Sequence, residues 1–119
     1  MNNSVFFNPA CDNCNTVKGI LEVRNIGADY VHYLDQAPSR EQIEEVMGLL
    51  GIDDPQEMMR AKEPIYQELN LESADRETLI NAMTEHPILI QRPIVIVDDK
   101  AIIARPAERV LEILDSQKG

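Results

Sequence analysis

The stretch "SVFFNPACDNCNTVKGIL" (residues 4–21) decides how this chain begins to fold. Residues 4–8 are short and mostly apolar, which is typical of a β-strand. From Asp12 onward, apolar residues recur with the period of a helix. The positions that share one helical face are Cys14, Val17, Ile20 and Leu21. The only two cysteines of the chain, Cys11 and Cys14, therefore stand where a strand passes into a helix.

The residues that follow complete a strand–helix–strand unit. Gly27 is a candidate for the residue that ends the helix, because glycine readily adopts the left-handed conformation found there. The β-rich run "DYVHYL" (29–34) predicts a second strand. Two strands joined through a helix are expected to be parallel, with a right-handed crossover.

Helical patterns dominate the middle of the chain, approximately residues 39–86. Ser39 and Gln42 form a capping-box pattern, and Asp54 with Pro55 is typical of a second helix start. This segment is too long for an ordinary connection. It is therefore predicted to be a helical insertion packed beside a sheet.

The end of the chain predicts two strands and a helix. "IVIV" (94–97) and "AIIA" (101–104) flank a turn, and a helical pattern begins at Pro106. A β-α-β unit followed by a β-β-α unit, with Cys-x-x-Cys after the first strand, is the plan of an α/β, thioredoxin-like fold. We predict one such domain over residues 1–119.

Composition limits the functions that this chain can have. Its 119 residues suit one domain, and its net charge of −10 argues against nucleic acid and anionic membranes as partners. Its apolar runs are far shorter than the roughly 20 residues of a membrane span, and the N-terminus does not resemble a secretory signal. We expect a cytoplasmic protein, where thiols stay reduced, and a monomer.

The cysteine pair admits a redox, a metal-binding and a purely structural interpretation. A helix N-terminus stabilises the thiolate, which favours Cys11 as the attacking thiol. Cys14, one turn into the helix, is either a resolving thiol or a small core residue. A zinc site needs two more ligands, and the two histidines of the chain, His32 and His86, lack ligand-like spacing. No bound metal or cofactor is expected.

Three arginines stand in contexts unlike an ordinary solvated surface. Arg60 ends "EMMR", Arg92 lies between "ILIQ" and Pro93, and Arg105 lies between "AIIA" and Pro106. A planar guanidinium binds two oxygens at once, so arginines suit a thiol that attacks an oxyanion. Together with Cys11, the three arginines predict an oxyanion site.

Longer motifs carry a resemblance to a known family. The motifs are "NPAC" (8–11), "YLDQAPSREQI" (33–43), "MMRAKEPIYQELNL" (58–71), "HPILIQRPIV" (86–95) and "ARPAERVLEIL" (104–114). Through them the whole chain resembles the arsenate reductases of the glutaredoxin-coupled, thioredoxin-fold type. "RPIV" is also shared with the related Spx-type transcription regulators.

The resemblance implies a role for each site residue. Cys11 would attack arsenate, while the residues that would hold the oxyanion are Arg60, Arg92 and Arg105. Asn8, Pro9 and Pro93 would be structural residues of the site, with a cis peptide before Pro93. Glutathione would be the co-substrate and glutaredoxin the reductant. If Cys14 instead resolves the adduct as a disulfide, the reductant would be thioredoxin, or glutaredoxin reducing a dithiol.

Three residues near Cys11 depart from the family pattern. Phe7 stands where relatives often carry His, Asn15 where they often carry Arg, and Cys14 where they often carry Ser. In addition, Asp12 brings a negative charge that disfavours the thiolate. Two alternative functions therefore remain open. One is a general Cys-x-x-Cys thiol–disulfide oxidoreductase, and the other is a non-enzymatic, Spx-like regulator that senses redox state and binds RNA polymerase.

Overall fold

A computed structural model describes residues 3–115 of the chain. Its described residues divide into two compact units, one formed by residues 3–33 with 92–115 and the other by residues 34–91. The first unit therefore combines segments from the first and last thirds of the chain. The prediction of a single domain with an insertion at approximately 39–86 stays a prediction.

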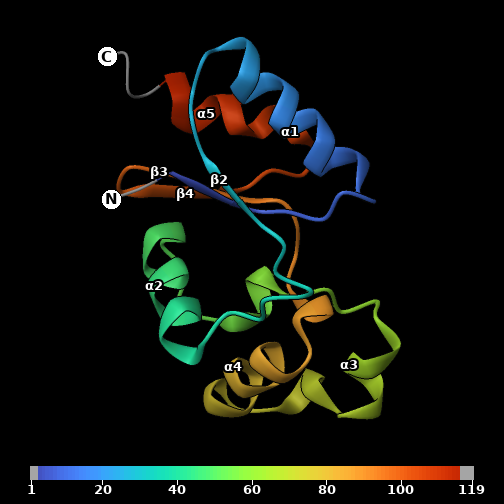
Figure 1. Cartoon of the computed structure of the whole chain (residues 1–119). Coiled ribbons are helices and arrows are strands. Elements are labelled where there is room, and N and C mark those ends of the chain that lie inside the picture. The colour runs from blue at the N-terminus through green and yellow to red at the C-terminus, as the bar shows by residue number, and fades with distance from the viewer. Residues whose placement is uncertain (1–2, 116–119) are drawn as a thin grey trace. The chain divides into compact units, whose positions relative to one another are not determined.

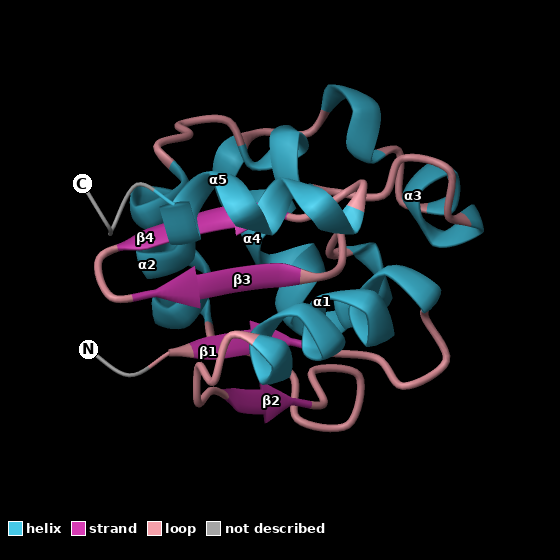
Figure 2. Cartoon of the chain, turned by 90° about the horizontal axis from the view of Figure 1, so that it is seen from above, coloured by secondary structure: helices cyan, strands magenta, loops and turns pink. Residues whose placement is uncertain are grey.

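The first unit contains a four-stranded mixed sheet (Figure 2). Its strands are β1 (Ser4–Phe6), β2 (Asp29–Val31), β3 (Ile94–Val97) and β4 (Lys100–Ile103). They lie in the order β2-β1-β3-β4. β1 pairs with β2 in parallel, whereas β3 is antiparallel to both β1 and β4. The predicted β-α-β unit and the C-terminal hairpin are thus confirmed.

The first two strands are shorter than predicted. β1 ends at Phe6 instead of Asn8, and β2 ends at Val31 instead of Leu34. Just past the end of β1, the Phe7 N–H still donates a hydrogen bond to the Val31 carbonyl of β2, at 2.8 Å. Beyond it Asn8 leaves the sheet for the loop that carries Cys11, which places the thiol at the end of β1.

The helix α1 (Asp12–Val23) ends before the residue predicted to cap it. Asn25, not Gly27, takes the left-handed conformation, with φ of 63°. The Asn25 N–H donates to the Glu22 carbonyl at 3.0 Å and the Ile26 N–H to the Leu21 carbonyl at 2.9 Å. These bonds form a Schellman motif, in which asparagine tolerates the left-handed position. The prediction of Gly27 was therefore wrong.

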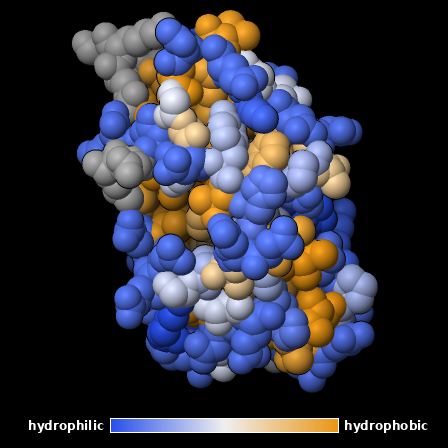
Figure 3. Space-filling model, in the orientation of Figure 1, coloured by the Kyte–Doolittle hydropathy of each residue, from blue (hydrophilic) through white to orange (hydrophobic). Residues whose placement is uncertain are grey.

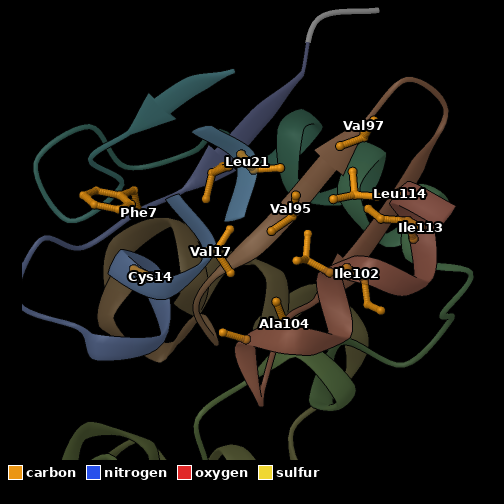
Figure 4. Packing of buried hydrophobic residues seen from close by; sticks show 13 residues of the cluster. Phe7, Cys14, Val17, Leu21, Val95, Val97, Ile102, Ala104, Ile113 and Leu114 are labelled. Carbon is orange, nitrogen blue, oxygen red and sulfur yellow. The ribbon is translucent and has the colours of Figure 1, made fainter. Parts of the chain in front are cut away.

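Two helices cover one face of the sheet in the first unit. α1 lies beside α5 (Val110–Asp115), which follows a 3-10 turn over Ala107–Arg109 (Figure 1). Val17 and Leu21 of α1 meet Val95 of β3 (Figure 4). The cluster that they build consists of Val5, Phe7, Cys14, Val17, Leu21, Val95, Val97, Ile102, Ala104, Ala107, Val110, Ile113 and Leu114. This core fixes the start of α1 against the sheet.

The second unit is helical. It contains α2 (Arg40–Leu50), α3 (Pro64–Glu68) and α4 (Arg76–Glu85), with 3-10 turns over Pro55–Met58, Leu71–Ser73 and Pro87–Leu89. The predicted capping box of Ser39 and Gln42 is present. The Arg40 guanidinium pairs with Glu44 of its own helix and with Glu77 of α4, and so links the two helices.

The face shown in Figure 3 is mostly hydrophilic and carries several hydrophobic patches. Over residues 3–115, none of the helices is long and apolar enough to cross a membrane.

Candidate active site at the start of α1

The loop between β1 and α1 is held by its own side chains. The Asn8 side-chain oxygen accepts a hydrogen bond from the Ala10 N–H at 2.9 Å, and the Asn8 carbonyl accepts one from the Cys11 N–H at 2.9 Å. From the first turn of α1, the Asn15 side-chain amide donates to the Pro9 carbonyl at 2.9 Å. The "NPAC" loop is therefore clamped from both sides, and Cys11 has a defined position.

Cys11 is the N-cap residue of α1, with φ of −98° and ψ of 124°. At this position the first N–H groups of the helix have no partner within the helix, so they can stabilise a negative charge on the Cys11 sulfur. Burial by itself raises the pKa of Cys11, but hydrogen bonds from the Cys14 N–H, the Cys14 thiol, the Arg92 guanidinium and the Asn13 N–H outweigh it. The net effect lowers the pKa of Cys11, which favours the nucleophilic thiolate.

Cys14 is the chemical opposite of Cys11. Its side chain is fully buried and belongs to the core of the first unit. Burial raises the pKa of Cys14 to about 11, and the neighbouring Cys11 adds to the shift, while the Asn8 N–H and the Arg92 charge oppose it. Cys14 therefore remains a thiol at neutral pH and donates its hydrogen bond to the Cys11 sulfur.

Arg92 immediately precedes cis-Pro93, and its guanidinium places a positive charge beside Cys11. Its Nη1 donates to the Tyr33 hydroxyl at 3.4 Å. Burial works to lower the pKa of Arg92, but hydrogen bonds and charge interactions with Tyr33 and Cys11 outweigh it and raise the pKa. Within residues 3–115, the Arg92 Nε–H is buried and has no hydrogen-bond partner. Such an orphaned donor is costly unless a ligand takes it.

Arg105 lies beside Arg92. Its Nη1 donates to the Arg92 carbonyl oxygen at 2.9 Å, and its side chain is exposed. The Arg105–Pro106 peptide is cis, like the Arg92–Pro93 peptide. The resemblance predicted the cis bond before Pro93, whereas no signal in the sequence indicated the one before Pro106. The structure thus brings Cys11, Cys14, Arg92 and Arg105 together within the first unit.

Arg60 belongs to the second unit. There its guanidinium binds the Glu63 carboxylate, with Nη2 at 3.1 Å and Nε at 3.2 Å from the same oxygen. Its backbone N–H donates to the Leu89 carbonyl at 2.7 Å. A role for Arg60 in oxyanion binding stays a prediction.

The residues that depart from the family pattern have structural partners. Phe7 is buried, with its ring 5.4 Å from that of Tyr30 and 5.8 Å from that of His32. The Lys18 ammonium lies 5.9 Å from the centre of the Phe7 ring and 5.5 Å from that of Tyr30. Asn15 clamps the loop, as described above. The pKa of Cys11 is lowered although neither Phe7 nor Asn15 is basic.

Two contributors to this region were missed in the sequence, namely Lys18 and Tyr33. The sequence pattern gives Lys18 no feature that separates it from other surface residues of α1. Tyr33 is one of two tyrosines in the predicted strand 29–34. The position of Tyr33 in the motif "YLDQAPSREQI" was the one available signal. As for metals, no group of three His, Cys, Asp or Glu side chains suited to bind an ion occurs in the described part of the chain.

The chain is similar to known proteins over nearly its full length. It is 41% identical to the arsenate reductase of Haemophilus influenzae over 112 residues, which cover 92% of this chain and 97% of that protein. It is 36% identical to the arsenate reductase of Neisseria meningitidis serogroup B over 112 residues, covering 92% and 96% of the two chains.

A solved structure gives the same picture. The arsenate reductase from Vibrio cholerae superposes with a TM-score of 0.90 at 38% identity, covering 95% of this chain and 98% of that chain. The predicted α/β, thioredoxin-like fold is confirmed by this match. A model of the ArsC family matches residues 6–113, and together with these relatives it shows that this chain belongs to the ArsC family.

Proposed function

We propose that this protein reduces arsenate to arsenite through Cys11. The observation that carries the proposal is the pairing of a thiol of lowered pKa with an arginine whose buried Nε–H has no partner among residues 3–115. A thiolate is repelled by an oxyanion unless positive charge lies between them, and a guanidinium offers both charge and directed donors. The names of the relatives and the family membership support arsenate as the anion.

The first step is attack of the Cys11 thiolate on arsenic. A sulfur–arsenic bond forms, and an arsenate oxygen leaves as water after protonation or as hydroxide. Arg92 and Arg105 are proposed to bind the remaining oxygens, with Arg60 as a third ligand. Donors of this kind stabilise the charge that develops in the transition state more than the charge of the ground state.

The second step needs a thiol as reductant. Glutathione thiolate attacks the Cys11 sulfur, and the electron pair of the sulfur–arsenic bond passes to arsenic, which leaves as arsenite. Cys11 is then in a mixed disulfide with glutathione. A glutaredoxin thiolate attacks the glutathione sulfur and releases the Cys11 thiolate. We propose glutathione and glutaredoxin as the reductants of this cycle.

The test is arsenate-dependent NADPH oxidation by the purified protein. Parallel reactions contain either glutathione, glutaredoxin and glutathione reductase, or thioredoxin and thioredoxin reductase. We expect turnover in the first reaction. Turnover only in the thioredoxin reaction would show that the cycle passes through a Cys11–Cys14 disulfide and not through a mixed disulfide with glutathione. Turnover in neither reaction would overturn arsenate reduction and favour disulfides as the substrates.

Cys14 has two candidate roles that one pair of variants separates. A resolving thiol must ionise and reach the Cys11 sulfur, whereas burial and a pKa of about 11 favour Cys14 as a hydrogen-bond donor. We expect Cys14→Ser, which keeps a donor, to retain most of the glutathione-dependent turnover. Cys14→Ala should lose about tenfold, because it removes one hydrogen bond to a charged sulfur.

The pH dependence of Cys11 alkylation gives a second comparison of Cys14→Ser with Cys14→Ala. The midpoint should move to higher pH in Cys14→Ala, since the thiolate loses a donor, and much less in Cys14→Ser. Complete loss of turnover in Cys14→Ser, with an unchanged alkylation profile, would instead identify Cys14 as the resolving thiol.

A further inference from the structure

Tyr33 is a buried tyrosine whose hydroxyl reaches the site. Its side chain is fully buried, and its ring stacks on that of Phe6 in β1, with the ring centres 5.9 Å apart and the planes inclined by 21°. A buried phenol requires a hydrogen-bond partner for its hydroxyl. Arg92 Nη1 supplies one at 3.4 Å. Tyr33 thus connects the strand that leads into the cysteine loop with the arginine that faces Cys11.

The contacts of Arg92 leave its guanidinium little freedom. Nη1 donates to Tyr33, the guanidinium also interacts with Cys11, and the main-chain carbonyl is held by Arg105 at 2.9 Å. A guanidinium is a rigid planar fork, so fixing one nitrogen fixes the directions of the other donors. The buried Nε–H is among those donors and has no protein partner within residues 3–115. The Tyr33 contact at Nη1 therefore restricts the directions in which this Nε–H can point.

We propose that Tyr33 is a positioning residue, which orients the Arg92 guanidinium toward Cys11 and toward an oxyanion bound at Arg92. The ring and the hydroxyl of Tyr33 make separate contacts. The ring packs against Phe6, and the hydroxyl holds Nη1. The part of the proposal that concerns the oxyanion rests on the proposed function, and the part that concerns Cys11 does not.

The informative variant is Tyr33→Phe, because it keeps the ring and removes only the hydroxyl. Without its tether, the guanidinium should spend less time beside the Cys11 sulfur. The midpoint of iodoacetamide alkylation of Cys11 should then move to higher pH, measured without arsenate. kcat/KM for arsenate should fall about tenfold, mostly through KM, while KM for glutathione stays unchanged.

Tyr30→Phe is the matched control. Tyr30 lies in β2, three residues earlier, and its ring packs on Phe7 and Lys18. It loses the same hydroxyl group, and we expect the alkylation profile and KM for arsenate to remain those of the wild type. Thermal denaturation of both variants verifies that each is folded, and a mere packing role of Tyr33 would alter the melting temperature without moving the alkylation profile.

The outcomes separate this proposal from the proposed function. A shifted alkylation profile in Tyr33→Phe alone supports the positioning role, even if the wild type does not turn over arsenate. An unshifted profile in a folded Tyr33→Phe overturns it, even if the wild type is an active reductase. If Tyr33→Phe is unfolded, Arg92→Lys provides the second measurement. An ammonium cannot form the fork, so an unshifted profile there would overturn the orienting role as well.

Discussion

Cys11→Ser should abolish arsenate reduction. Serine keeps the position at the start of α1, but its hydroxyl is not ionised at neutral pH and cannot form the mixed disulfide through which arsenic is reduced. The loss should be on the order of 10⁴-fold or more, which is background in the coupled NADPH assay. The variant should also lose the iodoacetamide alkylation of residue 11, because the low-pKa thiol at the N-cap is absent.

The substitution should leave the fold unchanged. Cys11 is only partly buried and makes its two backbone hydrogen bonds, one with Asn8 and one with Asn15, through main-chain atoms that serine also has. Circular dichroism and the melting temperature should match those of the wild type. Residual turnover within tenfold of the wild type would show that Cys11 is not the nucleophile, and would direct attention to Cys14.

Arg92→Ala should reduce kcat/KM for arsenate by about 10² to 10³, the range typical of removing one donor that stabilises transition-state charge. The same variant should move the midpoint of Cys11 alkylation to higher pH. The guanidinium stabilises the negative thiolate, so its removal raises the pKa of Cys11. Both effects are expected from one side chain, because Arg92 faces the thiol and its Nε–H has no hydrogen-bond partner in the described part of the chain.

Arg109→Ala is a matched control for this variant. Arg109 also belongs to the first unit, but its guanidinium pairs with Glu112 one turn further along the chain, at 3.3 Å. We expect unchanged turnover and an unchanged alkylation profile. Arg92→Lys should recover part of the alkylation profile through its charge but little of the arsenate affinity, since an ammonium lacks the planar fork. Wild-type kinetics in Arg92→Ala would overturn the proposed oxyanion site.

The parts of this protein that sequence alone determined are the local ones. A thiol placed between a strand and a helix start lies at a helix N-terminus in any fold, so Cys11 could be predicted as the candidate attacking thiol without coordinates. The capping box of Ser39 and Gln42 and the hairpin over 94–103 are equally local, and both are present. The end of α1 was mispredicted because Asn25 and Gly27 both tolerate the left-handed conformation, and the chain adopts it at Asn25.

The partners of Cys11 were decided by tertiary structure. Sheet pairing sets β3 beside β1, and Arg92 stands at the entry to β3; only that pairing brings it to a thiol at the far end of the sequence. The same holds for Tyr33, whose hydroxyl meets an arginine 59 residues away. In the sequence, Asn15 stands where relatives often carry a charged arginine. Only the folded loop shows that its side-chain amide donates a hydrogen bond to the Pro9 carbonyl. Hydrogen bonds between distant segments depend on where the core places the backbone, and that information is not carried by any local pattern.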